Sequence, residues 1–209
     1  MKIDRLTEPK LQGGRYEAVL DSGERLRLQP SVAAEFGLYA GMELDEETLA
    51  RIRESNGRAS ARARAVRILS ASGVSKNELR RRLVQKGETE ENAAGAVEWL
   101  DGLKLVNDAD TARRLASDAA RKGYGAARIR QILYQKGIPK ELWAEAMAEL
   151  PSPDGAIDRF LADRFRGSVP DAAEAKRAAE ALLRRGHRWE DVKRALRRYT
   201  DSLDDVSEE

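Results

Sequence analysis

The sequence contains no cysteine, and His187 is its single histidine. The lack of cysteine excludes disulfide bonds and thiolate chemistry and is typical of a cytoplasmic protein. Aromatic residues make up only 5% of the chain, a proportion that suits several thin helical layers better than one thick core. No stretch reaches the roughly 20 apolar residues of a membrane span, and the N-terminus lacks a signal-peptide pattern. We therefore expect a cytoplasmic protein that does not interact with membranes.

Residue patterns that indicate catalysis or metal binding are also missing. His187 follows a glycine in an expected loop and has no evident partner for acid–base chemistry, so we expect it to be exposed to solvent. No spacing of histidine and acidic residues matches a zinc or calcium site. Gly123 and Gly125 lack the preceding strand of a phosphate-binding loop and instead predict a tight turn between helices. The sequence therefore predicts a protein that is not an enzyme and uses no cofactor or metal.

One pattern is present three times, centred on Gly87, Gly137 and Gly186, at spacings of 50 and 49 residues. Each glycine follows a basic residue, has a leucine four positions before it, and has an alanine nine positions after it. Apolar residues also recur eight positions before and six, ten and thirteen positions after each glycine. This is the spacing of two buried helix faces separated by a glycine that ends the first helix. The chain therefore contains a helical repeat.

The repeat predicts a mainly all-α fold: three tandem three-helix repeats in an elongated curved array, preceded by a small N-terminal β-hairpin and short helices. The hairpin strands are expected at 15–20 and 24–28, and a joint at 54–57. Trp143 lies on the apolar stripe and is expected in the core, whereas Trp99 lies between stripe positions and is expected to be partly exposed. The predicted segments are an N-terminal region at 1–57, repeats at 58–105, 106–151 and 152–200, and an acidic tail at 201–209.

Positive charge recurs once per predicted repeat, although the whole chain carries a net charge of only +2. Residues 51–86, 112–140 and 175–200 have net charges of +9, +7 and +6, and the segments that follow them have −6, −5 and −5. Stacked repeats would align these helices into a basic stripe, which is the electrostatic footprint of a surface for a polyanion or an acidic protein. The alternative is that the cations pair with neighbouring acidic helices as a solvated surface.

The candidate partner-binding or nucleic-acid-binding residues are the basic side chains on the helix before each repeated glycine and on its neighbours. They are Arg62, Arg64, Arg67, Arg80, Arg81, Arg82, Lys86, Arg113, Arg114, Arg121, Lys122, Arg128, Arg130, Lys136, Arg184, Arg185 and Arg188.

Three stretches have a recognisable pattern: ARAVRILSASGVSKNELRRRLVQKG (63–87), LVNDADTARRLASDAARKGYGAARIRQILYQKGI (105–138) and GLYAGMEL (37–44). In these stretches the chain resembles the RecX family, and the likeness extends over nearly the whole sequence. It is more specific in the first two repeats than in the third. The chain departs from the family at Thr111, where an aromatic residue is usual, and this departure concerns a local packing contact.

The resemblance implies a bacterial regulator of the RecA recombinase that acts without catalytic residues. Such proteins bind along the groove of the RecA–single-stranded-DNA filament, suppress strand exchange, ATP hydrolysis and coprotease activity, and bind DNA weakly. We therefore expect a monomeric partner of the RecA filament that controls recombination and DNA repair. The rival hypothesis is a direct DNA-binding protein, in which each repeat places an arginine-rich helix in the groove as a helix-turn-helix does.

Overall fold

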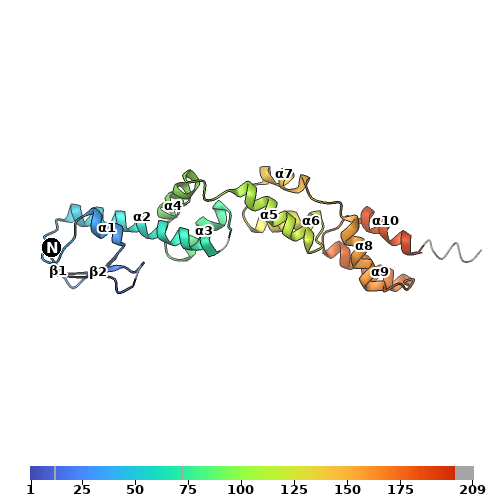
Figure 1. Cartoon of the computed structure of the whole chain (residues 1–209), viewed down its shortest axis with the longest axis horizontal. Coiled ribbons are helices and arrows are strands. Elements are labelled where there is room, and N and C mark those ends of the chain that lie inside the picture. The colour runs from blue at the N-terminus through green and yellow to red at the C-terminus, as the bar shows by residue number, and fades with distance from the viewer. Residues whose placement is uncertain (12, 72, 201–209) are drawn as a thin grey trace, which may run out of the picture. The chain divides into compact units, whose positions relative to one another are not determined.

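The computed structural model describes residues 1–11, 13–71 and 73–200, so the predicted tail at 201–209 lies outside the described residues. The chain divides into two compact units (Figure 1). Unit 1 comprises Met1–Gly73 with Glu78–Val106, and unit 2 comprises Val74–Asn77 with Asn107–Glu209.

In unit 1 three strands precede the helices. The third helix belongs to this unit from Glu78 onward, because its first two residues fall in unit 2. The elements are β1 (Ile3–Thr7), β2 (Tyr16–Leu20), β3 (Arg25–Leu28), α1 (Pro30–Glu35), α2 (Glu46–Ala71), α3 (Lys76–Gln85) and α4 (Glu90–Gly102). The described part of unit 2 is helical. Its elements are α5 (Asp108–Arg121), α6 (Ala126–Gln135), the 3₁₀ helix η1 (Lys140–Leu142), α7 (Trp143–Ala148), α8 (Asp154–Phe165), α9 (Ala172–Arg184) and α10 (Trp189–Thr200).

The N-terminal sheet has the antiparallel order β1-β2-β3. The predicted hairpin is confirmed as β2 and β3, which Gly23 joins at a φ of +83°. The edge strand β1 was not predicted, because among its residues only Ile3 is buried and the alternation of apolar and polar side chains is weak. Ile3, Leu20 and Leu28 pack with α1 and the beginning of α2 to form the core of this region.

Helix α2 runs without interruption through 54–57, so the predicted joint there is wrong. The polar and small residues of this stretch serve contacts within unit 1. Asn56 accepts a hydrogen bond from the backbone N–H of Gln29 at 2.8 Å and donates one to the carbonyl oxygen of Arg27 at 3.0 Å. A Cβ atom on Gly57 would lie 2.6 Å from Nδ2 of Asn92 on α4, so the glycine permits a close helix approach.

The three repeated glycines have the geometry that the pattern predicts. Gly87, Gly137 and Gly186 have φ angles of +90°, +67° and +88°, the left-handed conformation that ends a helix at low cost only for glycine. The leucine four residues before each glycine is completely buried, and the alanine nine residues after each is 0–4% exposed. The mainly helical fold and the three-helix repeats are therefore confirmed.

In unit 2 each repeat has its own apolar cluster. The second repeat packs α5, α6 and α7 around Ile129 and Leu133. Trp143, expected in the core, packs against this cluster but is only partly buried. The indole nitrogen of Trp143 also donates a hydrogen bond to the carbonyl oxygen of Ile138 at 3.0 Å. The third repeat packs α8, α9 and α10 around Leu161 and Leu182.

The second and third repeats are joined through their backbones. The N–H groups of Gly125 and Ala127, at the start of α6, donate to the carbonyl oxygens of Arg185 and Gly186 at 2.9 and 3.1 Å. A Cβ atom on Gly125 would lie 2.2 Å from the Gly186 oxygen, so glycine is required at this contact. The predicted tight turn at Gly123 and Gly125 is confirmed, and it also forms the junction between these repeats.

The segment Val74–Asn77 makes an equivalent contact within unit 2, using side chains. The Ser75 hydroxyl donates to the carbonyl oxygen of Lys136 at 2.5 Å, and the Asn77 amide donates to that of Gly137 at 2.9 Å. Ser75 and Asn77 lie twelve and ten residues before Gly87, the offsets that Gly125 and Ala127 have from Gly137. The repeat therefore reproduces its packing contacts as well as its helices.

Candidate partner-binding surface

Several candidate cations of unit 1 form ion pairs. The side chain of Glu78 is only 6% exposed, and its two oxygens bind the guanidinium groups of Arg81 and Arg82. Arg64 binds Glu88 at 2.7 Å, and that carboxylate is also largely buried. Removing a cation from a buried carboxylate is costly, so Arg64, Arg81 and Arg82 have a structural role whatever else they bind.

A further set of ion pairs lies on the surface. Arg80 of α3 binds Glu90 at 2.9 Å. Arg113 of α5 binds Asp110 and also Glu145 at 2.7 Å, and the hydrogen bond to Asp110 raises the guanidinium pKa. Because these pairs are exposed, each contributes little stability and an anionic partner can replace the carboxylate.

Three candidate arginines lie over aromatic rings, with the guanidinium carbon within 6 Å of the ring centre, a distance at which cation–π attraction contributes. The pairs are Arg62 with Trp99 at 5.3 Å, Arg128 with Tyr124 at 5.9 Å, and Arg185 with Phe160 at 5.0 Å. Trp99 is half-buried, as expected, and Arg62 covers its ring. Arg67 donates to the carbonyl oxygen of Ala63 in its own helix, Arg121 pairs with Asp118, and Arg114 is exposed on α5.

The remaining candidates are exposed cations that form no ion pair within the described part of the chain. They are Lys86, Lys122, Arg130, Lys136, Arg184 and Arg188. Each of the three repeats supplies at least one of them, on or next to the helix that the repeated glycine ends. The positive charge of this subset is therefore not compensated by an ion pair with any carboxylate of the described residues.

Lys140 belongs with this subset, although it was not among the predicted residues. It is exposed at the start of η1 and shares a shallow hollow with Arg130 and Trp143. The available signal was its place at the end of the +7 segment 112–140. It was missed because the prediction concentrated on the helix before each repeated glycine and included only Arg188 among the cations that closely follow one.

His187 is buried, so the prediction of a solvent-exposed loop residue is wrong. Only 6% of the residue is exposed, and its Nε2 lies 3.1 Å from the carbonyl oxygen of Gly123. Burial lowers the pKa of the imidazole, the Gly123 contact and Asp191 raise it, and the positive charge of Arg185 lowers it further. The burial comes from packing against a loop 64 residues away, which local sequence does not reveal.

Other buried polar residues have structural partners. Asp108, at the start of α5, accepts a hydrogen bond from the backbone N–H of Lys76 at 2.8 Å. Thr111, the departure from the family pattern, is 8% exposed on the same helix. Among the residues that the structure describes, no three acidic or histidine side chains are grouped closely enough to hold a metal ion. None of the helices in these ranges has the length and apolarity needed to cross a bilayer.

Comparison with known proteins shows that the chain is similar to bacterial proteins that are named as regulators. The family model described as RecX, second three-helix domain, matches residues 107–147, which span α5 to α7. Regulatory protein RecX of Escherichia coli strain K12 is 34% identical over 164 residues, covering 71% of this chain and 99% of that protein. The same protein from strain SMS-3-5 is 34% identical over 150 residues, covering 66% of this chain and 90% of the relative.

Two solved structures share the fold. A crystal structure of regulatory protein RecX matches 93% of this chain and 98% of its own, with a TM-score of 0.68 and 24% identity. The crystal structure of RecX from Lactobacillus salivarius matches 70% of this chain and 98% of its own, with a TM-score of 0.59 and 16% identity. At these identities the likeness concerns the fold alone.

Proposed function

The chain belongs to the RecX family of regulatory proteins, and from that premise we propose that it binds the RecA–single-stranded-DNA filament. In this proposal it inhibits the recombinase, ATPase and coprotease activities of RecA. It acts in the cytoplasm as a monomer, without catalysis and without a cofactor, and so controls recombination and DNA repair.

The observation that carries the proposal is the recurrence, beside each repeated glycine, of exposed cations that form no ion pair with a described carboxylate. Lys86 precedes Gly87, Lys136 precedes Gly137, and Arg184 lies two residues before Gly186. A nucleoprotein filament presents phosphates and acidic side chains at regular intervals. The cations of each repeat can therefore be attracted to anionic groups of the filament. Each contact is weak alone, but several contacts made by one chain add their free energies.

The proposed mechanism is obstruction. A protein held in the filament groove by several cations hinders the movement or extension of the filament that recombination needs. Since the cations contact the filament reversibly, inhibition depends on salt concentration and requires no chemical step.

The direct experiment measures ATP hydrolysis by RecA on single-stranded DNA with increasing amounts of this protein, at several salt concentrations. We expect hydrolysis to fall as the protein is added and the inhibition to weaken as salt is raised. Unchanged hydrolysis at a large excess of the protein in low salt would contradict the proposal.

The second candidate function is direct binding to DNA, which the arginine-rich helices α3 and α6 favour. In this alternative each three-helix repeat acts like a helix-turn-helix unit. Tight binding to naked DNA without RecA, with a steep dependence of the logarithm of affinity on the logarithm of salt concentration, would favour it over the filament proposal.

A further inference from the structure

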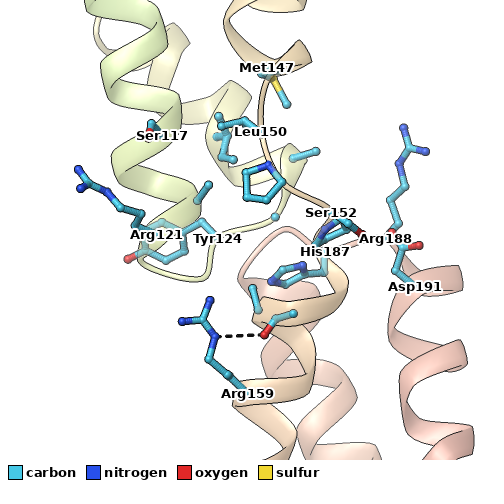
Figure 2. A pocket seen from close by; sticks show the side chains of 18 of the residues that line it. Ser117, Arg121, Tyr124, Met147, Leu150, Ser152, Arg159, His187, Arg188 and Asp191 are labelled. Carbon is cyan, nitrogen blue, oxygen red and sulfur yellow. Dashed lines mark hydrogen bonds between the residues drawn. The ribbon is translucent and has the colours of Figure 1, made fainter.

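A cavity of about 630 Å³ lies in unit 2, where the second and third repeats meet (Figure 2). Its walls come from α5, α6, α7, the linker after α7, α8 and the start of α10. Aliphatic side chains form much of the lining, among them Ile129, Met147, Leu150, Pro151 and Pro153. Concave apolar surface with a few polar groups is the usual composition of a ligand site.

Positive charge surrounds this apolar lining. Four arginines line the cavity, whereas Asp191 is the single acidic residue among its lining residues. Arg194 is compensated, since it binds Asp154 and Asp191 at 2.9 and 2.8 Å. Arg159 donates to the carbonyl oxygen of Gly155 at 3.1 Å, and neither Arg159 nor Arg188 forms an ion pair with a described residue.

His187 adds a buried hydrogen-bond acceptor to the same lining. Because its Nε2 faces a carbonyl oxygen, Nε2 carries the proton in the neutral ring, and Nδ1 is left with a lone pair. Nδ1 is buried and has no hydrogen-bond partner among the residues that the structure describes. A buried polar atom without a partner is uncommon in folded proteins and costs stability, so a donor from a bound molecule would complete the site.

We propose that this cavity binds an acidic peptide segment of a partner protein that carries an aliphatic anchor residue. The anchor packs against Ile129 and Met147, the flanking carboxylates bind Arg159 and Arg188, and a peptide N–H donates to Nδ1 of His187. The proposal requires no particular identity for the partner and does not rest on the proposed binding to the RecA filament.

A peptide fits this cavity better than a nucleotide. Proteins bind unpaired bases mainly by stacking them on aromatic rings or guanidinium planes. Tyr124 is the sole phenylalanine, tyrosine or tryptophan that lines the cavity, and the guanidinium of Arg128 already lies 5.9 Å from its ring centre. The aliphatic and proline side chains that form much of the lining offer no aromatic ring for a base, but they match an aliphatic side chain.

The test uses the fact that His187 is the only histidine in the chain. Histidine-selective ¹⁵N labelling of the full-length protein gives ring signals that belong to this residue alone. The probe is a fluorescein-labelled hexapeptide with two central leucines and four glutamates, followed by anisotropy and by the ¹⁵N signals. We expect saturable binding together with a shift of the Nδ1 signal, because a hydrogen bond to the lone pair changes its shielding.

Two variants test separately the charge contacts and the apolar cavity that the proposal requires. Reversing the charge of Arg159 and Arg188 to glutamate is expected to weaken peptide binding at least about tenfold, because two charge contacts are lost. Ala156→Leu fills part of the cavity with a residue that favours helix and is expected to weaken binding by a similar factor. The matched control replaces the exposed Lys176 and Arg177 of α9, which lie outside the cavity lining, by glutamate and should leave affinity within about twofold.

Three results would overturn the proposal. The first is peptide binding that leaves the His187 signals unchanged at saturation or that is unaffected by the Arg159→Glu/Arg188→Glu variant. The second is equal affinity for a hexapeptide with lysines in place of the glutamates. The third is a larger His187 shift with single-stranded oligothymidylate than with the acidic peptide, which would assign the cavity to nucleic acid.

Discussion

The surroundings of His187 in the folded protein lower the pKa of its imidazole and so favour the neutral form. Burial lowers the pKa of the imidazole, and Arg185 acts in the same direction, whereas the Gly123 carbonyl oxygen and Asp191 favour the charged form. The imidazole in the unfolded chain titrates near its ordinary pKa of about 6.5. The unfolded state therefore binds a proton at a higher pH than the folded state does.

This difference predicts a dependence of stability on pH. As pH falls below about 6.5, the free energy of unfolding should decrease, by at most about 1.4 kcal/mol per pH unit for one group. Above that pH the contribution should be flat. Urea unfolding at several pH values between 5.5 and 7.5 measures the slope. The chain has no other histidine, so His187→Gln should show a smaller slope, and equal slopes in the two proteins would contradict the assignment.

Gly125 and Gly95 form a matched pair for testing the junction between the second and third repeats. A Cβ atom on Gly125 would lie 2.2 Å from the Gly186 oxygen, whereas one on Gly95 of α4 would meet nothing within 4 Å. Gly125→Ala should destabilise unit 2 by about 1–3 kcal/mol or more, the range for overpacking a tight contact. Gly95→Ala should stabilise the protein by about 0.5–1 kcal/mol, because alanine favours the helix interior.

Calorimetric unfolding compares these two variants. A Gly125→Ala protein that unfolds at the same temperature as the original chain would show that the close backbone contact does not contribute to stability.

At the residue scale, the sequence predicted which side chains of the repeat are buried far better than it predicted the tertiary contacts of individual polar side chains. Leu83, Leu133 and Leu182 are buried because local helical spacing decides which face they occupy. The environment of His187 depends instead on a loop distant in sequence, and the pairing of Arg81 and Arg82 depends on the burial of Glu78. Contacts of this kind are set by tertiary packing, which periodicity does not specify.

At the element scale, the helices α4, α5 and α9 each begin directly after a residue whose side chain caps the helix. Asp171 accepts a hydrogen bond from the backbone N–H of Glu174 at 2.6 Å, and the Glu174 side chain accepts one from the N–H of Asp171 at 3.3 Å, so the two residues form a capping box at the start of α9. Asn107 caps α5 in a similar way through the N–H groups of Ala109 and Asp110. These side chains satisfy backbone donors that helix geometry leaves unpaired.

Removing the cap of α9 should therefore cost stability. Asp171→Ala is expected to lower the free energy of unfolding by about 1 kcal/mol, whereas Asp171→Asn should retain most of the capping free energy. Chemical denaturation of both variants measures the difference. Equal stability of the alanine variant and the original chain would mean that water satisfies the backbone N–H groups at the start of α9 as well as the Asp171 side chain does.

Two elements escaped sequence prediction for physical reasons. The strand β1 is an edge strand with a single buried residue, so it has little apolar alternation to detect. The stretch at 54–57 has the composition of a linker, yet α2 continues through it because Asn56 bonds the sheet and Gly57 allows α4 to approach. Tertiary contacts thus overrode the local preference of these residues.

At the scale of the whole molecule, the cations of the basic segments fall into two groups in the structure: those that form ion pairs and those that do not. Some cations, including Arg81 and Arg82, compensate buried or neighbouring carboxylates, as the ion-pair alternative proposed. Others, including Arg130 and Lys136, are exposed without an ion pair in the described ranges. Sequence could not separate the two groups, because the separation depends on which carboxylates the fold brings near, and the assignment of the candidates to a binding surface stays a prediction.

This separation decides which residues make a clean test of function. Reversing Arg80, Arg81 and Arg82 would leave the carboxylate of Glu78 without its cations and so confuse loss of folding with loss of binding. Arg130 and Lys136 avoid this difficulty, and neither lines the cavity between the second and third repeats. The exposed Arg5 and Lys10 of the N-terminal region offer a control with the same change in net charge.

The most direct test measures how strongly each protein inhibits ATP hydrolysis by RecA on single-stranded DNA at low salt, after circular dichroism has shown that the variants are folded. The concentration for half-inhibition should rise at least about tenfold for the Arg130→Glu/Lys136→Glu protein, because two charge contacts become repulsive. It should stay within about twofold of the original chain for Arg5→Glu/Lys10→Glu. Equal inhibition by all three proteins, or no inhibition by the original chain, would contradict the account.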